Sequence, residues 1–107
     1  MLAKKFRLNR RQINLIYKKG KGQKFGILGL KSLAVNLSFS RFAIVVPLAV
    51  LKKATDRNRL RRVAFSEIGQ ILKDKAIQNK DYIIRFYQAP NDEKELRQII
   101  QKVLQDV

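Results

Sequence analysis

The amino-acid sequence predicts one α+β domain over residues 1–107, an α/β sandwich in which three helices pack on a small mixed sheet. Two short apolar runs, residues 41–47 and 82–87, have the composition of buried strands. Segments with helical spacing precede, separate and follow these runs, at residues 10–19, 56–73 and from 92 onward. A chain of 107 residues suffices for one modest core, and we expect no internal domain boundary.

The first helix is expected over residues 10–19. Asn9 can cap its N-terminus, and Gln12 stands where a capping box has its reciprocal partner. Three side chains then share one face at i, i+3 and i+4, namely Ile13, Ile16 and Tyr17. Gly20 suits the C-terminal cap, so the helix should end before it.

Two strands are expected between the first and second helices. A short basic loop at residues 20–24 precedes the first predicted strand at 25–33, and a turn follows near 34–38. The second strand is predicted from Arg41 to Pro47. Because its apolar run is nearly continuous, both of its faces should be covered.

The second helix is expected over residues 56–73, with Asn58 and Arg62 turned away from its apolar stripe. That stripe consists of Leu60, Val63, Ala64, Ile68 and Ile71. The strands on either side of this helix can close as a parallel crossover. The last helix begins with acids, which the helix dipole favours there. Its apolar positions are Leu96, Ile99, Ile100, Val103 and Leu104. The predicted order is therefore α-β-β-α-β-α.

Positive charge is concentrated in the first part of the chain. The sequence has 24 Lys/Arg and 8 acids, a net charge of +16. Residues 1–62 hold 17 of the basic residues and one acid, Asp56, whereas residues 63–107 hold seven of each sign. This distribution indicates a polyanion-binding surface supported by a charge-balanced scaffold. A basic face that only maintains solubility is the alternative interpretation.

The residue types exclude several kinds of chemistry. With no cysteine and no histidine, the chain lacks thiolate ligands, the commonest zinc ligand and the commonest general base. Its acids are scattered and mostly adjoin Lys or Arg, so we expect no catalytic residue, metal site or small-molecule cofactor. The sequence shows no signal peptide and no apolar run of about 20 residues. We therefore expect no membrane contact and a cytoplasmic location.

Residues 57–62 carry the strongest functional signal. Four arginines and one asparagine fall within six residues at the start of the second predicted helix: Arg57, Asn58, Arg59, Arg61 and Arg62. Guanidinium groups fit phosphate oxygens, and a helix N-terminus disfavours cations that meet no anion. A solvent-facing helix usually interleaves acids with its basic residues, because such pairs stabilise it. No acid is interleaved among these arginines. We predict an RNA-binding surface here, extended by Lys52 and Lys53. Asn58 can contact RNA or cap the helix backbone.

Tyr17 on the first helix has two interpretations. It packs in the core together with Ile13, or it lines a groove in which an unpaired base can stack. Neighbouring basic residues, Arg10 and Arg11 among them, supply the charge that a single-strand groove needs. These four residues are the groove candidates.

The run from Lys52 to Arg62 closely resembles the signature of the bacterial ribonuclease P protein component. That signature is an Arg-Asn-Arg-x-Lys/Arg-Arg helix reached through a basic linker after an apolar strand. The likeness covers nearly the whole chain, including Arg7-Leu8, residues 41–46, residues 81–84 and the final helix. Three places depart from the family pattern. Phe65-Ser66 replaces Arg-Glu, Pro47-Leu48-Ala49 replaces Ser/Ala-Lys-Lys, and Ile13 replaces the first of two cleft aromatics.

The resemblance implies a fold and a role that composition alone does not give. It implies a left-handed crossover around the arginine helix and a protein subunit of ribonuclease P. Such subunits bind a large catalytic RNA and help it remove the 5′ leader of precursor tRNA. The RNA carries out the hydrolysis with bound Mg²⁺. By position, residues 57–59, 61 and 62 would contact the catalytic RNA, and Tyr17 would lie in the cleft that holds the leader.

Other classes of protein share parts of this pattern. A ribosomal protein that binds rRNA as a structural component would have the same basic, cysteine-free composition. A DNA-binding regulator could read the major groove with the arginine helix, but no helix-turn-helix spacing supports it. A nuclease that acts without RNA would need an active site that these residues do not suggest.

Overall fold

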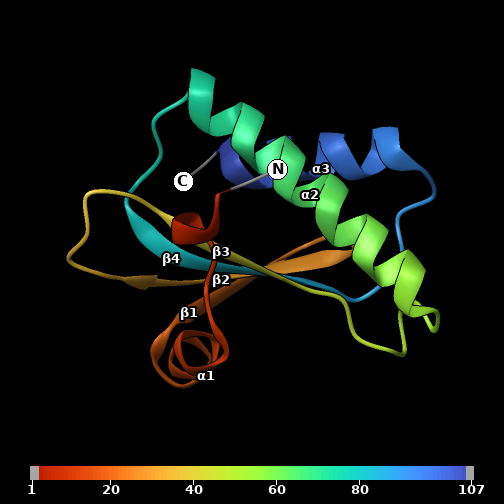
Figure 1. The fold of residues 1–107 in the computed structure, drawn as a ribbon, viewed down its shortest axis with the longest axis horizontal. Coiled ribbons are helices and arrows are strands. Elements are labelled where there is room, and N and C mark those ends of the chain that lie inside the picture. The colour runs from red at the N-terminus through yellow and green to blue at the C-terminus, as the bar shows by residue number, and fades with distance from the viewer. Residues whose placement is uncertain (1–2, 106–107) are drawn as a thin grey trace.

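The computed structural model describes residues 3–105, which form one four-stranded sheet with helices on both faces (Figure 1). The strands are β1 Lys21–Phe25, β2 Leu28–Ala34, β3 Arg41–Val45 and β4 Lys80–Phe86. The helices are α1 Arg10–Lys19, α2 Ala54–Asp74 and α3 Glu93–Gln105, preceded by a short 3₁₀ turn, η1, at Lys4–Phe6. No helix within the described residues is long and apolar enough to cross a bilayer.

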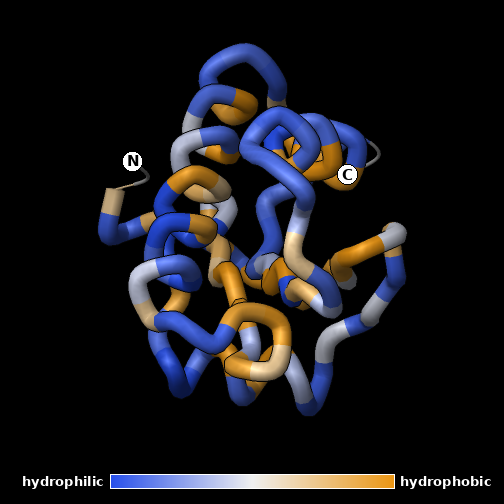
Figure 2. Tube along the Cα trace, turned by 90° about the vertical axis from the view of Figure 1, so that its right-hand side faces the viewer, coloured by the Kyte–Doolittle hydropathy of each residue, from blue (hydrophilic) through white to orange (hydrophobic). Residues whose placement is uncertain are grey.

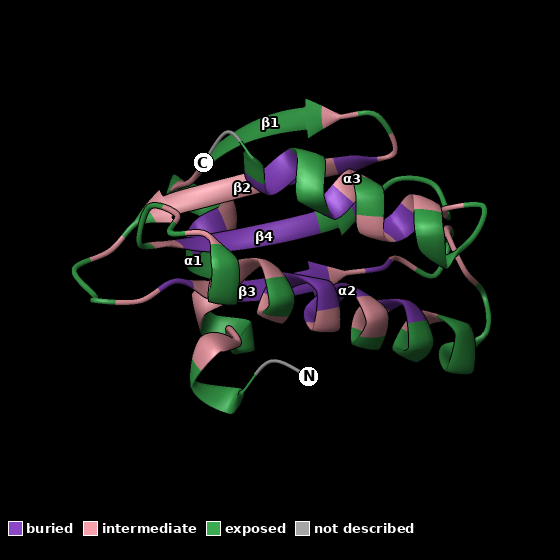
Figure 3. Cartoon of the chain, turned by 90° about the horizontal axis from the view of Figure 1, so that it is seen from above, coloured by how far each residue is buried: buried purple, intermediate pink, exposed green. Residues whose placement is uncertain are grey.

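The sheet is mixed, as the sequence predicts. Its strand order is β1-β2-β4-β3, with β3 parallel to β4 and the other pairs antiparallel. Helix α2 therefore connects two neighbouring parallel strands. Viewed from the helix side with these strands pointing upward, β4 lies to the left of β3, so the crossover is left-handed (Figure 3). The resemblance implied this hand, which is rare among parallel crossovers.

One strand more than expected is present between α1 and α2. The predicted basic loop 20–24 is wrong, because Lys21–Phe25 pairs with Leu28–Ser32 as a hairpin. The two-residue connection places Gly26 first, at φ +58, a conformation that glycine adopts without steric cost. The element order is thus α-β-β-β-α-β-α. All residues of β1 except Phe25 are exposed, so no burial pattern marked the strand in the sequence.

The core consists of two layers separated by the sheet. The larger layer lies under α2 and α3 and contains Leu28, Phe42, Ile68, Ile84, Phe86 and Ile100, among others. The smaller lies under α1, where Ile16 packs on Ala43 of β3 and Ile83 of β4. Figure 2 shows hydrophobic positions mainly along the strands and on the inner sides of the helices. Strand β3 is therefore covered on both faces, as its continuous apolar run predicted.

Helix α1 begins as the sequence predicts. The Asn9 side chain accepts a hydrogen bond from the Gln12 backbone N–H at 2.9 Å, and the Gln12 side chain accepts from the Asn9 backbone N–H at 2.8 Å. Gly20 ends the helix, but at φ −76 rather than in the left-handed conformation. A Cβ at Gly20 would lie 2.6 Å from the Ile16 carbonyl oxygen and 2.8 Å from that of Ser32. Glycine is therefore required here by close approach of two backbones.

Two buried acids fix the helices and strands relative to one another. Asp81 of β4 accepts two hydrogen bonds from Arg41 of β3, at 2.7 and 2.6 Å, and this bonding raises the pKa of Arg41. Glu67 of α2 accepts from Arg97 and Gln101 of α3, each at 2.9 Å. Both acids thus link elements far apart in the sequence.

Candidate nucleic-acid interface

The N-terminal half of α2 projects beyond the sheet and carries the predicted cationic residues (Figure 1). The helix begins at Ala54, two residues earlier than predicted, and its N-cap residue Lys53 makes no side-chain capping bond. Its first turn holds one acid, Asp56. Unpaired backbone N–H groups at this end add positive potential to that of Lys52 and Lys53. The local field therefore favours an anionic partner.

Arg57 differs from the other arginines of this helix because it bonds to its own backbone. Its Nη1 donates to the carbonyl oxygens of Leu51 and Lys52, each at 2.8 Å. These bonds hold the linker against the first turn of α2 and so position Lys52 and Lys53 beside it. Residue spacing alone could not show that Arg57 folds back toward the linker.

Arg59 and Arg62 are exposed, and within residues 3–105 neither forms a salt bridge or a side-chain hydrogen bond. Asn58 is also exposed and accepts a hydrogen bond from Arg61. The guanidinium of Arg61 is thereby oriented along the same helix. The three described salt bridges all lie elsewhere, at Arg41–Asp81, Arg97–Glu67 and Arg97–Glu93. Two exposed arginines, Arg59 and Arg62, consequently lie near the exposed Lys52 and Lys53 with no carboxylate partner within residues 3–105.

The groove candidates of α1 lie on the opposite face of the sheet from α2 (Figure 1). Arg10 and Arg11 are exposed in its first turn, whereas Ile13 and Tyr17 are half-buried. Ile13 and Tyr17 both pack partly against the smaller core, yet they line two different depressions. The structure therefore places the exposed cations of residues 52–62 on one side of the sheet and the α1 candidates on the other.

Ile13 lines a depression of about 580 Å³ at the β3 edge, where the chain before α1 contributes three cations: Lys4, Lys5 and Arg7. We call these three residues the edge cluster. The Nε atom of Arg7 is buried and has no hydrogen-bond partner in the described structure. A buried guanidinium N–H without an acceptor is costly, and nothing within the described residues offsets this cost. No motif marks the edge cluster in the sequence, where only the density of positive charge at residues 4–7 could have indicated it.

Tyr17 lines a second depression, of about 460 Å³, over the part of the sheet that α1 leaves open. Five of its residues interleave cations and aromatic rings, and we call them the hairpin face: Tyr17, Lys24, Lys31, Arg85 and Tyr87. Lys31 Nζ lies 5.2 Å from the Tyr17 ring centre, and Lys24 Nζ lies 5.1 Å from that of Tyr87. These separations are within cation–π range.

The hairpin face depends on Gly29, a glycine in the interior of β2. A Cβ at Gly29 would lie 3.1 Å from the Tyr87 ring, so a larger residue would push this ring away. Glycine in a strand interior often marks such a close approach. Tyr87 remains 51% exposed, so its ring is available for stacking.

The fold and these surfaces place the protein in the class of small basic α/β sandwiches that carry a cationic helix. No group of three or more His, Cys, Asp or Glu residues gathers within residues 3–105. The profile of the family Ribonuclease P matches residues 2–107. The chain therefore belongs to the ribonuclease P protein family, and its function is that of a protein subunit of this tRNA-processing endoribonuclease.

Solved structures of ribonuclease P proteins show the same fold. The Staphylococcus aureus protein is 20% identical with a TM-score of 0.82, and the match covers 94% of each chain. The Thermotoga maritima protein is 23% identical with a TM-score of 0.77, covering 94% of this chain and 96% of that one. A second Thermotoga maritima structure, a complex with 1-(4-fluorophenyl)-2-thiourea, is 26% identical with a TM-score of 0.73, covering 92% and 95%. A comparison with curated proteins gives no significant match.

Proposed function

We propose that this chain binds the catalytic RNA of ribonuclease P through the N-terminal half of α2 and its linker. The contact residues are Lys52, Lys53, Arg57, Asn58, Arg59, Arg61 and Arg62. One observation carries the proposal: Arg59 and Arg62 lie exposed beside two lysines with no carboxylate partner within residues 3–105. Phosphate oxygens would supply the charge-assisted hydrogen bonds that the fold leaves unmade. Arg57 would act mainly by holding the linker in place.

The single-stranded 5′ leader of precursor tRNA would run along the α1 side of the sheet. Tyr17 and Tyr87 offer ring faces for unpaired bases, and the lysines beside them can neutralise the leader's phosphates. Arg10, Arg11 and Ile13 would border the path at the start of α1. Because α1 and α2 lie on opposite faces of the sheet, the protein could hold the leader and the catalytic RNA at once.

We assign no catalytic residue to the chain. Hydrolysis of the leader would be carried out by the RNA subunit with its bound Mg²⁺. The protein would contribute by neutralising phosphate repulsion between two RNAs, which otherwise demands more Mg²⁺. The protein should therefore stimulate leader removal most strongly at low Mg²⁺ concentration.

Reconstitution tests this function directly. The chain is mixed with a bacterial ribonuclease P RNA and precursor tRNA at low Mg²⁺, and release of the leader is followed over time. We expect strong stimulation by the wild-type chain and a large loss with Arg59→Ala/Arg62→Ala. Lys94→Ala, which removes an exposed cation of α3, is the matched control and should remain fully active. No stimulation by the wild-type chain, or co-purification with ribosomal subunits instead, would contradict the proposal.

A further inference from the structure

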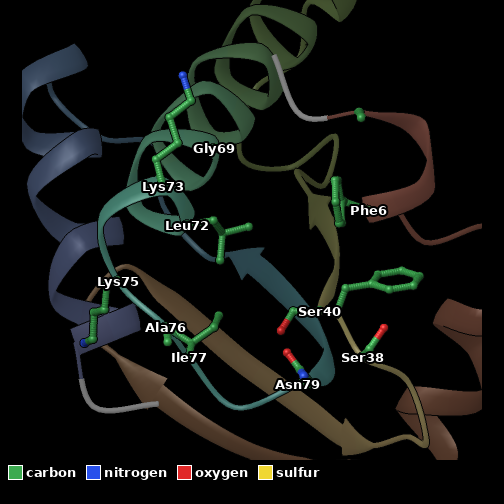
Figure 4. Close-up of a pocket in the computed structure, with 12 residues that line it drawn as sticks. Phe6, Ser38, Ser40, Gly69, Leu72, Lys73, Lys75, Ala76, Ile77 and Asn79 are labelled. Atoms are coloured by element: carbon green, nitrogen blue, oxygen red, sulfur yellow. The ribbon is translucent and has the colours of Figure 1, made fainter.

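We propose that the pocket beside the C-terminal half of α2 holds one unpaired nucleotide of an RNA strand. This base-binding subsite is separate from the arginines of α2 and from the hairpin face. It lies between α2, the segment 75–79 and the residues that precede β3 (Figure 4). Its volume of about 480 Å³ is within the range of small-ligand sites. The inference rests on the RNA-binding function proposed above.

The walls of the pocket suit a flat ring with polar edges. Phe6 and Phe39 form an edge-to-face pair with ring centres 5.5 Å apart, and Leu72 and Ile77 line the opposite side. Three polar side chains gather near the start of β3: Ser38, Ser40 and Asn79 (Figure 4). Ser40 Oγ already donates to the Gln78 carbonyl oxygen at 3.1 Å. Aromatic and aliphatic walls favour the faces of a nucleobase, and the Ser38 hydroxyl and the Asn79 amide can bond to its edge.

The charge around the pocket distinguishes a nucleotide from an apolar peptide. No acid lines the pocket. Lys5 Nζ lies 4.8 Å from the Phe6 ring centre and 5.5 Å from that of Phe39, and Lys73 is exposed at the rim. A nucleotide matches both the walls and the charge of this pocket, because its base fits between the apolar walls and its phosphates can lie near Lys5 and Lys73.

Gly69 gives an independent reason to regard the pocket as a binding site. It lies in the interior of α2, where glycine destabilises a helix relative to alanine, and it lines the pocket. Helix stability therefore does not explain this residue. A side chain at Gly69 would occupy space that a base needs.

The test uses the full chain labelled with ¹⁵N and a short single-stranded adenosine RNA. Amide NMR signals are followed for the pocket (residues 38–40, 69 and 76–79) and for the arginine-bearing turns of α2. The matched probe is an abasic RNA of the same length, which keeps the phosphates and removes the bases. We expect the adenosine RNA to shift both sets of signals and the abasic RNA to shift only those of the arginines.

Variants sharpen the result. Gly69→Leu should raise the melting temperature, abolish the pocket shifts and leave the arginine shifts intact, whereas Gln70→Leu on the neighbouring residue should change neither set. If the adenosine RNA shifts the arginine signals but not the pocket, the subsite proposal is overturned and RNA binding by α2 stands. If neither probe shifts the arginine signals, the RNA contact proposed for α2 fails. If Gly69→Leu does not fold, the comparison of the two RNAs on the wild-type chain still shows whether the pocket binds a base.

Discussion

At the residue scale, partners distinguish the arginines that build the fold from those that are available to RNA. Arg41 and Arg97 bond to buried acids, which raises the pKa of each guanidinium. Arg57 bonds to two carbonyl oxygens of the linker. Arg59 and Arg62 have no such partner within the described residues. The sequence alone does not distinguish these five arginines. Their surroundings in the fold show which stabilise the structure and which are available to RNA.

Removing the partner of a buried acid should be costly. The Asp81 side chain is 4% exposed, so Arg41→Ala would leave its carboxylate buried without its partner. We expect a loss of about 3 kcal/mol in the free energy of unfolding, measured by urea denaturation. Arg62→Ala should change stability by less than about 0.5 kcal/mol, because its side chain is exposed. A loss below about 1 kcal/mol for Arg41→Ala would show that the pair does not stabilise the fold.

The hydrogen-bond partners of Glu67 could not be predicted from the sequence. A charged residue near an apolar stripe has no explanation within its own helix. Its partners, Arg97 and Gln101, follow about 30 residues later and meet it only when α3 packs on α2. By contrast, the Asn9–Gln12 capping box is local, and the sequence predicted it correctly.

At the element scale, the helices and strands with a buried face were predicted from the sequence, whereas the exposed strand β1 was not. Helices α1 and α3 and strand β3 each carry an apolar pattern of the right period, and all three form as expected. Strand β1 has mostly exposed residues and two glycines nearby, so its pairing with β2 depends on the hairpin turn rather than on burial. Likewise, the hairpin face became visible only when β1, β2, β4 and α1 were placed together.

Two glycines at the junction between α1 and the hairpin should respond differently to alanine. Gly20→Ala would place a Cβ 2.6 Å from the Ile16 carbonyl oxygen, which α1 cannot move without breaking its last turn. We expect a loss of about 1–3 kcal/mol from thermal or urea unfolding. At Gly22 the nearest atoms belong to the flexible Lys31 side chain, at 3.6 Å, so Gly22→Ala should have little effect. Equal effects of the two changes would contradict the close packing of α1 on β2.

At the scale of the whole molecule, charge is separated from the core. The net charge of +16 resides in the first 62 residues, yet those residues span both faces of the sheet. Cations therefore surround the fold at the arginines of α2, the edge cluster and the hairpin face. Self-repulsion among them should destabilise the chain when no polyanion is bound.

Multivalent anions should consequently stabilise the isolated protein. Sulfate or phosphate that binds the folded chain raises stability by about 2.7 kcal/mol at a concentration 100-fold above its dissociation constant. We expect the melting temperature to rise with sulfate more than with chloride at equal ionic strength. An identical rise with both salts would indicate screening alone, without anion sites.

The salt dependence of binding to a ribonuclease P RNA shows whether the arginines of α2 contact RNA phosphates. The affinities of the wild-type chain and of Arg59→Ala/Arg62→Ala are measured over a range of KCl concentrations. Each phosphate contact contributes about 0.7–0.9 to the log–log slope. We predict that the variant binds more weakly and that its slope is shallower by about 1.5, while its melting temperature is unchanged. Equal affinities and slopes for the two proteins would contradict the assignment of α2 as the RNA-binding helix.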